Sequence, residues 1–173
     1  MANNFAPCLA FVLKAEGGWS DNPNDPGGCT MHGITLASYQ EWKHNLALTC
    51  SDLHVISETE VTDFYYDEYW IPSHGASMPL GVDLMVVDAG VNMGLGRSAK
   101  ILQAQVGVTA DGAIGPATLT AVLAIEPTIL IDALTQAQIN FYYGLADYAI
   151  FGQGWINRVN AREAAALVMS KIA

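Results

Sequence analysis

The sequence is poor in basic residues. Lysine and arginine together number only seven, against seventeen aspartates and glutamates, and the formal net charge of the 173-residue chain is −10. Proteins that bind nucleic acid hold its phosphates with clustered lysine and arginine side chains, so this composition argues strongly against nucleic acid as a partner. The same shortage argues against binding to an anionic membrane surface.

Long apolar runs are also missing. No stretch approaches the roughly 18 consecutive apolar residues that a membrane-spanning helix needs, so we expect no membrane insertion. The N-terminal segment is apolar, but its only lysine, Lys14, comes after the apolar part. A signal peptide begins with basic residues, and we therefore expect the first helix of the fold there instead of a signal peptide.

Cysteine and histidine are too few and too scattered for a metal site. The three cysteines are an odd number at wide spacing, which fits neither a disulfide framework nor a zinc pattern. Cys8 lies on an apolar helical face and is expected to be buried, whereas pairing between Cys29 and Cys50 is left open by the sequence. The four histidines show no metal-binding spacing, and we expect no metal and no cofactor.

The residues that are abundant predict a packed helical protein. Hydrophobic residues make up 51% of the chain and charged residues 14%, which is enough for the core of one domain or of one domain with two lobes. Helical spacing, caps and breakers predict a mainly α (α+β) fold with about seven to eight helices and one small β-hairpin within residues 20–30. The helices are expected near 3–16, 36–48, 57–70, 79–94, 97–107, 116–125, 127–149 and 155–172, with Gly152 and Gly154 interrupting the chain before the last one.

Residues 16–35 contain the candidate chemistry. Glu16 ends the first helix, where the helix dipole is unfavourable for a carboxylate by a few tenths to about 1 kcal/mol. Asp25 and Thr30 follow in a segment rich in turn residues. Two carboxyl groups with room for a water molecule between them are what inverting glycoside hydrolysis requires. Glu16 is the candidate acid, Asp25 with Thr30 the candidate water-holding pair, and Asp21 the alternative second carboxylate.

The same segment, EGGWSDNPNDPGGCTMHGIT, resembles the signature of glycoside hydrolase family 108, which comprises bacterial and phage N-acetylmuramidases with a lysozyme-like fold. The similarity continues in DAGVNMG at 88–94, in Leu102-Gln103 with DGAIGPAT at 111–118, and in GWINR at 154–158. DGAIGPAT also resembles a turn of peptidoglycan-binding domains. We expect a catalytic lobe at 1–95 with the hairpin next to the active site. A helical C-terminal lobe at 96–173 resembles a peptidoglycan-binding region and is expected to pack with it as one globular unit.

This resemblance implies a lysozyme of the phage endolysin type. Such an enzyme is bacteriolytic, hence antimicrobial, and hydrolyses the β-1,4 bond between N-acetylmuramic acid and N-acetylglucosamine in peptidoglycan. The order of Glu16, Asp25 and Thr30 is similar to that of phage-type lysozymes, although the spacing to Thr30 is one residue shorter here. The alternatives are a lytic transglycosylase, which needs no water-positioning carboxylate, and a noncatalytic peptidoglycan-binding protein.

Further residues are expected to contact the glycan or to support the site. Flat aromatic rings stack on sugar faces, and polar residues near the motifs can bind sugar hydroxyls. Asp88 on its apolar helix must find a partner, and Arg158 and Arg162 are expected to pair with acidic residues near the cleft. The predicted substrate-binding residues are Trp19, Asp21, His32, Tyr65, Trp70, Asn92 and Trp155.

The expected setting of the protein follows from the resemblance and from the missing signal peptide. Its partner is the glycan strand of peptidoglycan, and we expect it to act as a monomer. We expect synthesis in the bacterial cytoplasm and release to the cell wall through a holin-type pore, as for phage endolysins, or by another route that does not use a signal peptide.

Overall fold

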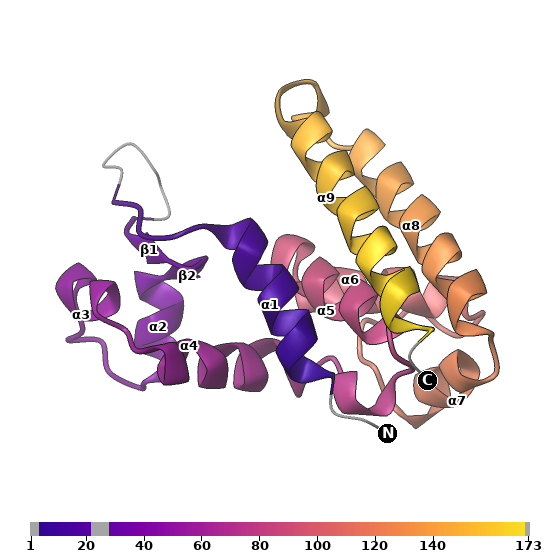
Figure 1. Ribbon diagram of the computed structural model, residues 1–173, viewed down its shortest axis with the longest axis horizontal. Coiled ribbons are helices and arrows are strands. Elements are labelled where there is room, and N and C mark those ends of the chain that lie inside the picture. Colours follow the sequence, from indigo (N-terminus) through magenta and orange to yellow (C-terminus); the bar gives the residue numbers. More distant parts are fainter. Residues whose placement is uncertain (1–3, 22–27, 172–173) are drawn as a thin grey trace.

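The computed structural model of the chain describes residues 4–21 and 28–171. These residues form nine α-helices and one two-stranded antiparallel hairpin (Figure 1), which confirms the mainly α, lysozyme-like class. A π-helical turn at Tyr66–Trp70 and a short 3₁₀ helix at Gly75–Ser77 complete the elements. The bounds are α1 Phe5–Glu16, β1 Thr30–Met31, β2 Ile34–Thr35, α2 Leu36–Trp42, α3 Cys50–His54, α4 Glu58–Tyr65, α5 Val82–Met93, α6 Leu95–Gln105, α7 Pro116–Leu123, α8 Pro127–Tyr143 and α9 Tyr148–Met169.

Helix α1 lies between the two halves of the molecule. In Figure 1 the hairpin, α2, α3 and α4 lie on one side of it, and α5 to α9 lie on the other. The helix ends at Glu16, as expected, because Gly17 adopts a φ of 75°, which glycine reaches without steric cost. The carboxyl group of Glu16 therefore emerges where the two halves meet.

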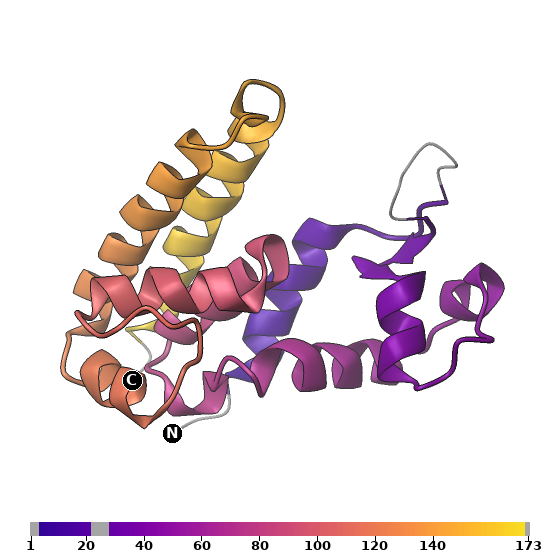
Figure 2. The same cartoon turned by 180° about the vertical axis from the view of Figure 1, so that it is seen from behind.

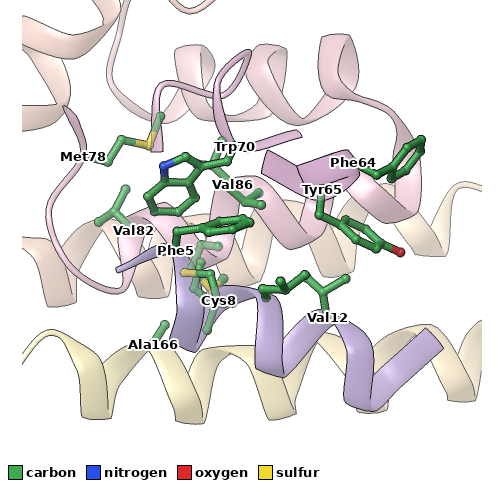
Figure 3. Packing of buried hydrophobic residues seen from close by; sticks show 14 of the residues in the cluster. Phe5, Cys8, Val12, Phe64, Tyr65, Trp70, Met78, Val82, Val86 and Ala166 are labelled. Carbon is green, nitrogen blue, oxygen red and sulfur yellow. The ribbon is translucent and has the colours of Figure 1, made fainter. Parts of the chain in front are cut away.

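Helix α5 is the centre of the core. Every residue from Val82 to Gly90 is buried, and the helix packs against α1, α6, α8 and α9. Figure 3 shows the side chains of Phe5 and Cys8 from α1 packed with Trp70 and Val86. The prediction of a strongly buried helix here is confirmed, and so is the burial of Cys8.

The hairpin lies later in the chain than its predicted position within residues 20–30. Thr30 pairs with Thr35 and Met31 with Ile34, and an isolated bridge joins Ser20 to Thr30. The two-residue turn between the strands is His32-Gly33, with φ values of 51° and 79°. Positive φ at both central positions suits the right-handed twist of paired strands, and this dipeptide therefore sets the turn.

Several predicted helix bounds are wrong, most clearly near the end of the chain. Gly152 and Gly154 do not interrupt a helix, and α9 is continuous from Tyr148 to Met169. A Cβ atom at Gly152 would lie 2.4 Å from ring carbons of Tyr148, so this glycine serves close packing, which compensates its low helix propensity. Helices α2 and α8 also end earlier than predicted, and α3 was not predicted.

A disulfide bond joins Cys29 to Cys50, with an S–S distance of 2.05 Å. It connects the residue before β1 to the first residue of α3, and so ties the hairpin to the helices beside it. Within the described residues no single helix has both the length and the hydropathy to span a membrane, although α7 and α8, bent by 116°, meet these criteria jointly.

Candidate active site

The carboxyl group of Glu16 is held from two sides. Its side chain is 20% exposed, and Oε1 lies 2.7 Å from Nη1 of Arg158 on α9. On the other side it meets the hairpin turn, because a Cβ atom built on Gly33 would lie only 2.7 Å from Oε2. The end of α1, the hairpin and α9 thus converge on one acid.

A buried ionic network lies behind this acid. Asp88 of α5 is fully buried and accepts hydrogen bonds from Arg158 at 2.7 and 3.2 Å and from Arg162 at 2.6 Å. Arg162 also donates to the side-chain oxygen of Gln138, whose amide nitrogen donates to the Met85 carbonyl. Two carboxylates therefore balance two guanidinium groups. The expectations that Asp88 has a partner and that both arginines pair with acids are confirmed.

Burial and charge act against each other at the two arginines. Burial lowers the pKa of Arg162, and the charge of Asp88 opposes that decrease. Burial also disfavours the charged form of Arg158, but its hydrogen bonds and ion pairs with Asp88 and Glu16 outweigh this, and its pKa lies above the ordinary value. Arginine stays protonated in proteins, so removal of Asp88 would leave buried positive charge uncompensated.

Tyr65 and His32 fix the hairpin turn against the end of α1. The hydroxyl group of Tyr65 donates to the His32 carbonyl at 2.7 Å, and Nδ1 of His32 lies 3.2 Å from the Gly17 carbonyl oxygen. Burial, and then the charge of Glu16, raise the pKa of Tyr65, which keeps its hydroxyl a neutral donor. The turn is thereby anchored to both α4 and α1, with Gly33 against Glu16.

A cavity of about 660 Å³ lies between α1 and α9, and Arg158, the ion-pair partner of Glu16, lines it, whereas Glu16 itself does not. We call it the α1–α9 cavity. Its volume is within the usual range of ligand sites, which suits part of a glycan strand. The predicted contacts Asn92 and Trp155 both line it, and Trp155 stacks on Tyr142 with ring centroids 5.1 Å apart. The lining residues are Phe11, Lys14, Ala15, Asn92, Gly154, Trp155, Asn157, Arg158, Ala161 and Ala165.

Lys14 and Asn157 line this cavity but were not predicted as site residues. Both are exposed polar residues, and each lies within two positions of a residue that the sequence had singled out, Glu16 or Arg158. Proximity to the motifs was therefore an available signal. Only the packing of α9 beside α1 shows that the two side chains border one space.

Two of the predicted aromatic contacts need correction. Trp70 is 2% exposed, and its ring packs against Phe5 and directly over Gly75. Tyr65 is 3% exposed and uses its hydroxyl group on the hairpin. Neither ring has a face that a sugar can reach, because both rings are buried in the hydrophobic core.

Of the remaining predicted residues, those that the structure describes lie on the hairpin side of Glu16. Trp19 is half-buried and stacks on His54 with ring centroids 4.4 Å apart, and Asp21 is exposed. Thr30 is half-buried in β1. Asp25 lies outside the described residues. Among residues 4–21 and 28–171, no three histidine, cysteine, aspartate or glutamate side chains gather in a way that could hold a metal ion.

Comparisons with known proteins cover both halves of the chain. The model of the family described as Glycosyl hydrolase 108 matches residues 9–94, and a model described as Predicted Peptidoglycan domain matches residues 97–160. Among solved structures, SagA of Brucella abortus is 36% identical and superposes with a TM-score of 0.87, with 96% of this chain and 95% of SagA covered. A comparison with curated proteins gave no match.

Proposed function

Because the chain belongs to the glycosyl hydrolase 108 family, and so is a glycoside hydrolase that acts on peptidoglycan, we propose that it is a muramidase. The bond cleaved is the β-1,4 bond between N-acetylmuramic acid and N-acetylglucosamine. The observation that carries this proposal is the position of Glu16 at the end of α1, where its side chain is 20% exposed and is held between the hairpin turn and Arg158, which lines the α1–α9 cavity.

Glu16 is proposed to protonate the glycosidic oxygen of the leaving sugar. In the structure its carboxylate is paired with Arg158, and it must carry a proton to act as an acid. The proposal therefore requires Arg158 to move away from Oε1 when the glycan enters the cavity. Its two hydrogen bonds to Asp88 provide a site where the guanidinium group can remain.

Water attacks the anomeric carbon from the opposite face while the leaving oxygen is protonated, because inversion is a single displacement. We assign the water to Asp25, assisted by Thr30, which lies in β1, the strand that leads into the turn that contacts Glu16. This assignment rests on the order of residues in the sequence, with Asp21 as the alternative. Inversion requires carboxyl groups about 6.5–9.5 Å apart, which leaves room for that water. Asp25→Asn and Asp21→Asn variants distinguish the two acids, since only one of them should lose cleavage.

Glu16→Gln is the direct test. The substitution is nearly isosteric, so the fold should persist while the rate of release of reducing ends from purified peptidoglycan falls by about 10²–10⁴-fold. Glu41→Gln, at an exposed position of α2, is the matched control and should behave as the wild type. Substantial cleavage by Glu16→Gln would remove Glu16 from this role.

The products separate hydrolysis from the transglycosylase alternative. A hydrolase leaves reducing muramic acid ends, whereas a lytic transglycosylase leaves anhydromuramic ends, and mass spectrometry of the digested wall distinguishes them. The anomer first formed, followed by NMR, tests inversion, since an inverting enzyme acting on a β bond releases the α anomer. Anhydromuramic products would contradict the proposed water step, and absence of any cleavage would favour a noncatalytic binding protein.

A further inference from the structure

Four of the seven basic residues line two cavities: Lys14 and Arg158 line the α1–α9 cavity, and the other two line a second one. Arg97 and Lys100 line a second cavity, of about 550 Å³, between α6 and α8. We call it the α6–α8 groove. No acidic residue is among its lining residues in the described part of the chain, although acidic residues outnumber basic ones more than twofold. The lining residues are Gly96, Arg97, Lys100, Ile101, Ala104, Gln105, Ala137 and Phe141.

Both charges are positioned by neighbouring groups and are not held in salt bridges among the described residues, although the charge of Lys100 also acts on the carboxylate of Asp111. The guanidinium group of Arg97 lies over the ring of Phe141, 4.7 Å from its centroid. The side chain of Lys100 packs on the turn at Gly112, where an added Cβ atom would lie 3.1 Å from Cε. Within the described residues neither side chain forms a salt bridge, in contrast to Arg158 and Arg162. The groove therefore presents two exposed cations on one face of α6.

The groove and the α1–α9 cavity are lined by different helices and have no lining residue in common. Helices α1 and α9 face the viewer in Figure 1, whereas α6 and α8 face the viewer in Figure 2, which is seen from behind. All lining residues of the groove except Gly96 also lie within residues 97–160, the part matched by the peptidoglycan domain model. It is thus a separate surface from the one proposed to cleave the glycan.

We propose that the α6–α8 groove binds the carboxylates of peptidoglycan stem peptides. Stem peptides combine free carboxylates with small apolar side chains such as alanine. The groove matches this pattern, because Ile101, Ala104 and Ala137 form an apolar floor beside the two cations. Arginine binds a carboxylate through two parallel hydrogen bonds, and lysine supplies a point charge. This inference rests on the proposed function in that peptidoglycan is the common ligand.

Such a site retains the enzyme on the wall. The net charge of the chain is −10, which repels an anionic polymer at long range, and two local cations offset this repulsion where the stem peptide lies. Because the groove is not beside Glu16, it contributes affinity for the wall and leaves the cleavage step itself unchanged.

Co-sedimentation with purified peptidoglycan tests the proposal. The full chain carries Glu16→Gln so that the wall is not digested during the measurement. Adding Arg97→Gln and Lys100→Gln should weaken binding about tenfold, since two charge-assisted contacts are lost. A matched control removes two exposed cations elsewhere, Lys43→Gln and Lys171→Gln, and should bind as the parent does. Equal binding by the two double variants overturns the proposal.

Chemical modification of the wall identifies the group that is bound. The parent should bind weakly to peptidoglycan whose carboxylates are methyl-esterified. This weak binding should equal that of the groove variant to untreated peptidoglycan. Undiminished binding to the esterified wall, or binding that depends on wall phosphate polymers, overturns the assignment to stem-peptide carboxylates.

Cleavage of peptide-free glycan strands keeps the two proposals apart. In chains with an intact Glu16, the groove variant should cleave these strands at the wild-type rate, because they lack the proposed ligand of the groove. A slower groove variant on this substrate overturns the separation between groove and cleavage site. Absence of cleavage by the wild type would contradict the proposed function but not the groove proposal, because co-sedimentation measures binding independently of cleavage.

Discussion

Arg158 reaches Glu16 from the opposite end of the chain, with 2.7 Å between Nη1 and Oε1, and its other two donor nitrogens bind Asp88. The candidate acid is therefore held by α9, the last helix, which is itself fixed on α5 by the same arginine. The C-terminal half of the chain is thus part of the architecture of the candidate active site. Disturbing the docking of α9 should affect cleavage as well as stability.

Asp88→Asn should destabilise the protein strongly. The carboxylate is fully buried and compensates Arg158 and Arg162, so its removal leaves buried positive charge, at a cost of about 3–5 kcal/mol. The free energy of unfolding from urea titration measures this. Asp132→Asn, at an exposed position of α8, is the control and should lie within about 0.5 kcal/mol of the wild type. A loss below about 1 kcal/mol for Asp88→Asn would contradict the network.

Gly33→Ala should impair cleavage more than it impairs folding. Its φ of 79° strains any side chain, at a cost of about 1 kcal/mol or more, and the new methyl group would meet Oε2 of Glu16. Displacing the acid by about 1 Å should lower the rate on the order of 10²-fold, as measured by release of reducing ends. Gly18→Ala is the matched control, because nothing lies within 4 Å of its added carbon and its φ is ordinary. Equal activities of the two variants would show that the turn does not position Glu16.

Reduction of the disulfide should destabilise the hairpin side of the molecule. Cys29 and Cys50 are separated by 21 positions, and closing a loop of that size in the unfolded chain is worth about 3 kcal/mol in the chain-entropy model. The melting temperature should fall on addition of a thiol reductant. The double variant Cys29→Ser with Cys50→Ser should start at the lower value and show no response to reductant. A response in that variant would point to Cys8, the buried free cysteine, and contradict this account.

Glu60 should make stability depend on pH in the acidic range. Hydrogen bonds from Lys43, and then from Ser57, lower the pKa of this carboxyl group from 4.5 to about 2. A carboxylate with a lower pKa in the folded state stabilises the protein above its unfolded pKa, and this stabilisation is lost as the pH falls from 4.5 toward 2. Because the pair is partly solvent-exposed, the effect should be no more than about 1 kcal/mol.

Thermal unfolding of Glu60→Gln measures this contribution. The variant should be less stable than the wild type at neutral pH, and the two melting curves should converge near pH 2. Glu58→Gln, one residue into the same helix and exposed, is the control and should run parallel to the wild type. A constant difference between Glu60→Gln and the wild type from pH 7 to pH 2 would exclude the ion pair as its cause.

Two tryptophans should differ in what their removal affects. Trp70→Ala empties a core position, which should cost about 3–5 kcal/mol while the folded fraction keeps its rate of cleavage. Trp155→Ala removes a wall of the α1–α9 cavity, and the main effect should be a higher KM for peptidoglycan with a smaller loss of stability. Unfolding curves and steady-state kinetics on both variants test this. The reverse pattern would mean that the cavity is not the glycan site.

Local signals predicted much of the fold and the position of the main acid. Gly17 and Gly18 end α1 at Glu16, Ser57 and Glu60 form the predicted capping box, and Thr35 caps α2. These features depend on backbone conformation and on neighbours within four residues, which the sequence lists directly. The residues of the active-site motif could be identified for the same reason.

For contacts between distant segments, the sequence indicated that a partner is needed but not which residue it is. The sequence indicated that Arg158 needs an acidic partner, but the packing of α9 against α5 and α1 selected Asp88 and Glu16. It left the pairing of Cys29 with Cys50 open, and it assigned Trp70 to the glycan although the ring belongs to the core. The sequence by itself thus determined the end of α1 at Glu16, the caps of α2 and α4, and which side chains are candidates for the chemistry. Tertiary packing alone decided which of them meet, because burial depends on surfaces brought together from distant parts of the chain.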